Sequence, residues 1–174
     1  MNAPESGTFH RQFVLLFEAQ FQRLYRYLDR LSGDPDLAAD VAQDAFVRLY
    51  QRGALPEQPE AWLVSVAMNL FRNVKSSRAR RQRLLTLSRS EGVVGDPPPQ
   101  PDRAVEDSES RIHVRAALDR MPARERDLLL LSAEGYSYRD LAAVLGLNEA
   151  SVGTLLARAR RAFRKCYEDP NAPR

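Results

Sequence analysis

Hydrophobic side chains recur every three or four positions over most of the chain, the spacing that gathers them on one face of an α-helix. From Thr8 to about Leu31 this pattern predicts a long amphipathic helix that ends before Gly33 and Pro35. Its apolar stripe consists of Phe9, Phe13, Leu16, Phe17, Phe21, Leu24, Leu28 and Leu31.

Two more helices are predicted before residue 87. One follows Pro35 and stops at Gly53 and Pro56. Its inward positions are Leu37, Val41, Ala45, Phe46 and Leu49, and its outward, mainly acidic positions are Asp36, Asp40, Gln43 and Asp44. The other begins at Glu60 and ends in a strongly basic segment. Its predicted buried positions are Trp62, Leu63, Val66, Leu70 and Val74.

Periodicity is lost between residues 87 and 107, where glycines and a run of prolines cannot continue a helix. Beyond it, helices are predicted over 108–121, from Pro122 to about Ala133, over 138–145 and at the end of the chain. Strict alternation of polar and apolar residues is absent. The sequence therefore predicts an all-α fold with two small helical domains, 8–86 and 108–168, joined by a flexible acidic, Pro-rich linker, 87–107. Because the linker has no core of its own, we expect the domains to move independently.

The last two helices have the pattern of a helix-turn-helix, with Gly146 in the turn and Asn148 as N-cap of the second helix. One side of the second helix would pack through Val152, Leu155, Leu156, Ala159 and Phe163. The other side carries Ser151, Thr154, Arg158, Arg161 and Lys165. Such a helix fits the major groove, where Arg158 would pair with guanine while Arg160, Arg161, Arg164 and Lys165 neutralise phosphates. The alternative interpretation is a basic face that contacts only solvent. The supporting helix and the glycine turn favour DNA binding over it.

Charge is segregated along the chain, although the net charge is only +3. Residues 71–89 contain seven Arg or Lys and no acid, whereas residues 90–110 contain six acids and the single base Arg103. Adjacent basic and acidic blocks indicate two polyelectrolyte surfaces. The third helix also mixes amides with cations, which favours single-stranded or melted DNA as a ligand; Trp62 at its start is more typical of a core residue.

Several function classes are disfavoured. The single cysteine, Cys166, precludes an internal disulfide framework and fits a reducing cytoplasm. No apolar run approaches the ~20 residues that span a bilayer, and the start lacks a signal-peptide pattern, so a cytoplasmic protein without membrane insertion is predicted. His10 and His113 lie in separate predicted domains and no glycine-rich phosphate loop is present. We therefore expect no enzyme activity, metal site or cofactor.

The order of these parts resembles the extracytoplasmic-function (ECF) sigma factors of bacterial RNA polymerase. Residues 40–46 are similar to their region 2.2, residues 61–69 to regions 2.3 and 2.4, and residues 108–165 to region 4. By this resemblance Asp40, Gln43 and Asp44 would bind the β′ clamp helices of core polymerase, and the β flap would be a further contact. The linker would pass through the active-site cleft and RNA exit channel. An anti-sigma factor is a further candidate partner.

The resemblance also assigns DNA contacts. The −10 element would be opened and held by the loop 52–59 together with Asn69, Arg72, Asn73, Lys75 and Arg78. The −35 element would be bound as duplex by Ser151, Thr154, Arg158, Arg160, Arg161 and Lys165. Without a gap, residues 150–152 align with the Gly-Thr-Val that commonly starts the family's recognition helix, which leaves Gly153 and Leu155 where the family usually carries cations. The alternative function is a helix-turn-helix regulator with an N-terminal sensor or dimerisation domain.

Overall fold

The computed structural model describes residues 3–88 and 105–168, and all regular secondary structure in these ranges is helical. The elements are α1 (Ala3–Ser32), α2 (Pro35–Arg52), α3 (Pro59–Ser88), α4 (Val105–Arg120), α5 (Ala123–Ala133), α6 (Tyr138–Leu145), the short 3₁₀ helix η1 (Glu149–Ser151) and α7 (Val152–Glu168). The all-α fold with two small helical domains is confirmed. Most of the predicted linker, 89–104, lies outside the described residues; at its margins α3 continues to Ser88 and α4 begins at Val105.

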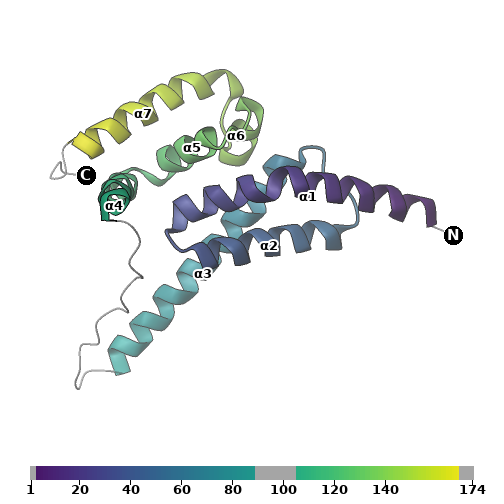
Figure 1. Ribbon diagram of the computed structural model, residues 1–174, viewed down its shortest axis with the longest axis horizontal. Coiled ribbons are helices and arrows are strands. Elements are labelled where there is room, and N and C mark those ends of the chain that lie inside the picture. The colour runs from purple at the N-terminus through teal and green to yellow at the C-terminus, as the bar shows by residue number, and fades with distance from the viewer. Residues whose placement is uncertain (1–2, 89–104, 169–174) are drawn as a thin grey trace.

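The first domain consists of α1 and α2 lying side by side and α3 crossing them (Figure 1). The five predicted inward positions of α2 are all buried. The stripe on α1 is buried only in its C-terminal half, because the N-terminal end of α1 extends beyond the other helices (Figure 1). Phe17, which the pattern places in the stripe, is 39% exposed.

Helix α3 buries a different face from the predicted one. Of its five predicted core residues only Leu63 is buried, and the other four are half-buried. Val64, Ala67 and Met68 are buried instead. The reason is that α3 packs against α2 on one side and against α6 of the second domain on another, so its buried face is broader than one stripe.

The second domain is built around α5, which packs against both α6 and α7, while α4 packs against α7. Its buried apolar residues are Ala117, Leu118, Met121, Leu128, Leu130, Leu131, Tyr136, Leu141, Ala142, Val152, Leu156 and Ala159. Helix α7 contributes only its inner face to this core, which leaves the opposite face open along its length.

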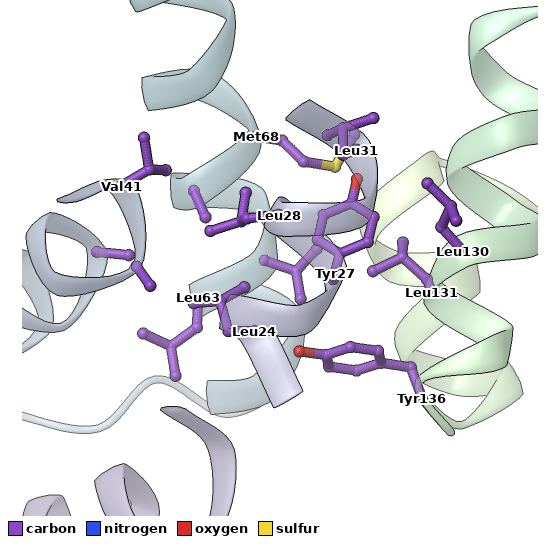
Figure 2. Close-up of a cluster of buried hydrophobic side chains, with 14 of the residues drawn as sticks. Leu24, Tyr27, Leu28, Leu31, Val41, Leu63, Met68, Leu130, Leu131 and Tyr136 are labelled. Atoms are coloured by element: carbon purple, nitrogen blue, oxygen red, sulfur yellow. The ribbon is translucent and has the colours of Figure 1, made fainter. Parts of the chain in front are cut away.

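The two domains share one apolar core. Helix α5 packs on α1 and α6 packs on α3. Figure 2 shows Leu131 and Tyr136 of the second domain pointing toward Tyr27 and Leu24 of the first. The sequence did not predict these contacts, because a linker without a core says nothing about how the domains pack; that the domains move independently stays a prediction.

Candidate nucleic-acid interfaces

The acidic face of α2 is exposed, as predicted. Asp40, Gln43 and Asp44 follow one another at helical spacing on the side opposite the core. The helix is held at its start by Asp34, whose carboxylate accepts hydrogen bonds from the Leu37 N–H at 3.0 Å and from Arg78 at 3.0 Å. These two donors lower the pKa of Asp34. The three side chains thus stand on a rigid, capped helix.

An apolar groove of about 330 Å³ lies beside this acidic face. Its lining residues come from α1 and α2: Phe13, Phe17, Gln43, Phe46, Val47, Tyr50 and Gln51. Val47 is 43% and Tyr50 50% exposed, although both are large apolar or aromatic side chains. Sequence reasoning missed this groove; the available signal was that Val47 and Tyr50 lie off the packed stripe of α2.

From its middle onward, α3 presents amides and cations to solvent. The predicted residues Asn69, Arg72, Asn73, Lys75 and Arg78 are all exposed. Arg72 donates to the Asn69 side-chain oxygen at 3.3 Å, which brings one amide and one guanidinium together on the surface. A shallow groove of about 310 Å³ runs along this part of the helix. It is lined by Asn73, Val74, Ser77, Arg78 and Arg81.

Trp62 is half-buried at the start of α3, and the Arg52 guanidinium carbon lies 5.9 Å from the centre of its ring. This distance is within the range of a cation–π contact. The core role that we favoured for Trp62 therefore holds only in part, because one part of the side chain remains open to solvent beside the loop 52–59.

The helix-turn-helix is formed by α6 and by η1 with α7, which are bent by 110° at the turn between them. Ser137 caps α6 and exchanges hydrogen bonds with Asp140 in a capping box. Gly146 ends α6 with a φ of 60°, a left-handed conformation that glycine adopts without strain. Arg124 of α5 donates to the carbonyl oxygens of Leu145 and Gly146 at 2.9 and 3.1 Å, which fixes the turn against the domain.

The final helix has the two faces that the sequence predicts. Val152, Leu156 and Ala159 are buried and Leu155 and Phe163 are half-buried. The predicted DNA-facing residues are all exposed: Ser151, Thr154, Arg158, Arg160, Arg161 and Lys165. Ser151 lies in η1 and the other five lie on α7, and Arg158 is ion-paired with Glu125 of α5.

The start of this helix differs from the prediction. The Asn148 side chain accepts from the Ala150 N–H at 3.0 Å and so caps η1, not α7 itself. Ser151 belongs to this 3₁₀ turn, and α7 begins at Val152. The physical reason is that a 3₁₀ turn separates Asn148 from α7. The Asn148 side chain reaches only the first free N–H groups after it, and these belong to η1.

The second domain also contacts the first through charged groups that sequence reasoning missed. Glu134, at the end of α5, forms ion pairs with Arg26 at 2.8 Å and Arg30 at 2.6 Å, both on α1. Arg115 of α4 donates to the carbonyl oxygens of Arg30 and Ser32 at 2.9 and 2.8 Å. No local pattern signals these pairs, because the partners are far apart in sequence.

Among the described residues, no three His, Cys, Asp or Glu side chains gather as a metal site would require. In the same part of the chain no single helix is long and apolar enough to cross a membrane, although α6 taken together with η1 and α7, a bent pair, passes the same test.

Comparison with protein families gives two matches. Residues 16–83 match the model of sigma-70 region 2, and residues 112–163 match that of sigma-70 region 4. A solved complex of the sigma factor RpoE with the anti-sigma factor NepR from Bartonella quintana contains a similar fold. Its TM-score is 0.61 at 23% identity, covering 92% of this chain and 97% of that one. The fold and the two family matches together define a helical protein that contains sigma-70 regions 2 and 4.

Two curated relatives identify the group of sigma factors to which the chain belongs. The chain is 35% identical over 143 residues to the ECF RNA polymerase sigma factor EcfG of Rhodopseudomonas palustris, covering 78% of this chain and 72% of that protein. It is 33% identical over 146 residues to the ECF sigma factor SigE of Mycolicibacterium smegmatis, covering 82% of this chain but only 56% of that longer protein. The chain belongs to the ECF RNA polymerase sigma factors.

Proposed function

We propose that this chain is a transcription initiation factor that binds core RNA polymerase, directs it to specific promoters and melts the −10 element. The observation that carries the proposal is the order of three exposed surfaces along matched sigma-70 regions: the acidic face of α2, the basic end of α3 and the outer face of α7. We assign it no catalytic activity and place its action in the cytoplasm, with the polymerase.

The acidic face of α2 would bind the β′ clamp helices. Asp40, Gln43 and Asp44 offer carboxylate and amide oxygens on a capped helix, and the apolar groove beside them is lined partly by Gln43. An amphipathic helix with basic and apolar side chains would complement both features, because charge pairing at the rim guides association and the apolar centre excludes water.

The middle of α3 would hold the opened −10 strand. Asn69 and Arg72 lie within hydrogen-bonding distance of each other, so an unpaired base would meet an amide edge and a cation at the same place. The outer face of α7 would bind the −35 element as duplex. Residues 87–107 would run through the polymerase between the two domains.

Run-off transcription tests the proposal. The purified chain would be added to bacterial core polymerase on sheared genomic DNA of the source organism, and transcript starts would be mapped. Discrete starts that require the chain are expected. Their absence, together with sequence-specific duplex binding by the chain alone, would favour the helix-turn-helix regulator.

A further inference from the structure

The start of α5 holds the helix-turn-helix at two neighbouring positions. Arg124 donates to the carbonyl oxygens of Leu145 and Gly146, in the turn. The next residue, Glu125, forms an ion pair with Arg158 of α7, and its Oε1 lies 3.1 Å from Nε of the arginine. Helix α5 also packs along α7 (Figure 1). One helix therefore fixes both the turn that places α7 and one side chain of its outer face.

The two members of the ion pair differ in exposure. The Arg158 side chain is 70% exposed, whereas the Glu125 side chain is only 20% exposed. Glu125 also lies in the first turn of α5, where the helix dipole favours a negative charge. Because a mostly covered carboxylate on a packed helix has few orientations, Glu125 is the fixed partner, and Arg158 is the partner whose direction the pair restricts.

The ion pair leaves the far end of the Arg158 guanidinium open. A guanidinium carries N–H donors on Nε and on both terminal nitrogens. The pair with Glu125 joins Nε, and within the part of the chain that the structure describes neither terminal nitrogen of Arg158 donates a hydrogen bond. In the major groove, guanine offers O6 and N7 as adjacent acceptors, which arginine meets with two N–H groups at once. An arginine held at Nε therefore keeps the donors that a guanine contact needs.

The Glu125 carboxylate also acts against unspecific binding. DNA phosphates attract any cation within reach, and contacts to them carry no direct sequence information. If Arg158 turned away to bind a phosphate, it would leave its partner carboxylate uncompensated near a negatively charged backbone. A base contact made with the pair intact has no such cost. The carboxylate therefore lowers the affinity for the wrong sites more than the affinity for the right one.

We propose that Glu125 is a specificity-determining residue for the −35 element, because it positions Arg158 for one guanine and keeps that arginine from the phosphates. The inference rests on the proposed function, in which the outer face of α7 binds the −35 duplex. Glu125 acts on DNA only through Arg158, so it is a positioning residue. Its substitution should change selectivity more than it changes affinity for the cognate promoter.

The test uses the full-length chain bound to core polymerase, on promoter fragments in which each −35 position carries all four base pairs in turn. Glu125→Gln keeps the size of the side chain and removes its charge. Glu149→Gln makes the same change at an exposed position of η1 that forms no pair with Arg158, and it is the matched control. Glu125→Gln is also combined with Arg158→Ala, which shows whether the two residues act together.

The Kd of each complex is measured for every fragment at several salt concentrations. We expect Glu125→Gln to lower discrimination at one G·C pair about threefold to tenfold, since the freed arginine must be ordered on binding. It should also bind scrambled fragments more tightly, with a salt dependence steeper by about one counterion. Glu149→Gln should strengthen binding to all fragments alike and leave discrimination unchanged. In the Arg158→Ala background, Glu125→Gln should not change discrimination.

Two results would overturn the inference. If Glu125→Gln discriminates as well as the wild type, the carboxylate does not position Arg158. If discrimination falls by the same factor with and without Arg158, Glu125 acts through another group. Failure of the proposed function looks different, because the wild type would then start no transcripts with core polymerase. If the chain alone still binds a duplex selectively, the same variants on that duplex decide the role of Glu125; if it binds none, the inference fails as well.

Discussion

Arg158 of α7 forms an ion pair with Glu125 of α5, with Nε and Oε1 3.1 Å apart. The arginine side chain is 70% exposed, so the pair adds little to stability. Its effect is on orientation, because the Glu125 carboxylate, whose side chain is 20% exposed, limits the directions that the guanidinium takes. An arginine held in one direction loses less conformational freedom when it binds a base.

Arg158→Ala should therefore weaken binding to the cognate −35 duplex by about 1–3 kcal/mol and reduce discrimination at one base pair. Arg161→Ala, on the same helix, should instead weaken all duplexes alike and reduce the salt dependence of binding by about one counterion. Titration of the two variants against cognate and scrambled duplexes at several salt concentrations checks this. Equal discrimination by wild type and Arg158→Ala would remove the base-binding role.

Asp40→Ala combined with Asp44→Ala should weaken core polymerase binding by roughly tenfold or more, since a charged partner would lose two carboxylates. The fold should persist, because both side chains are exposed. Asp36→Ala, another exposed acid of α2, is the matched control and should bind normally. The measurement is a Kd for core polymerase. Unchanged affinity in the double variant would contradict the clamp assignment.

Asp34→Ala should destabilise the chain by about 1 kcal/mol through loss of the N-cap of α2. Asp34→Asn keeps the cap oxygen and removes only the charge, so it should cost less. The pKa of Asp34 is lowered from 3.8 by the Leu37 N–H and by Arg78. Its charge therefore stabilises the fold above pH 3.8, and this contribution is lost as pH falls through the lowered pKa. Thermal unfolding of both variants across this range tests the sign.

Asp127→Asn should stabilise the chain by about 1 kcal/mol at neutral pH. Burial raises the pKa of Asp127 above 3.8, against the opposing charges of Arg126 and Arg72. A raised folded-state pKa means that the stability present below pH 3.8 is lost as pH rises through the raised value. The neutral amide avoids that loss, so wild type and variant should converge in Tm at low pH. A variant less stable at neutral pH would contradict this account.

The local sequence pattern was sufficient to predict most of the helices and the exposed residues of the candidate surfaces. Helix α6 has the predicted bounds, 138–145, because a capping serine, an apolar stripe and a glycine stop lie within ten residues of one another. Likewise Asp40, Gln43 and Asp44 are exposed as predicted, since helical periodicity places them opposite the core of α2. The η1 turn was missed because helix and 3₁₀ turns have the same local signals.

By itself, then, the sequence determined the helices, the family resemblance, the faces of α2 and α7 and the exposed polar positions of α3, all of which depend on local pattern. The tertiary structure alone decided that Glu134 meets Arg26 across 108 residues and that Phe17 lines an open groove. Such contacts depend on how two finished surfaces pack, and neither periodicity nor spacing within one helix encodes which surface lies opposite.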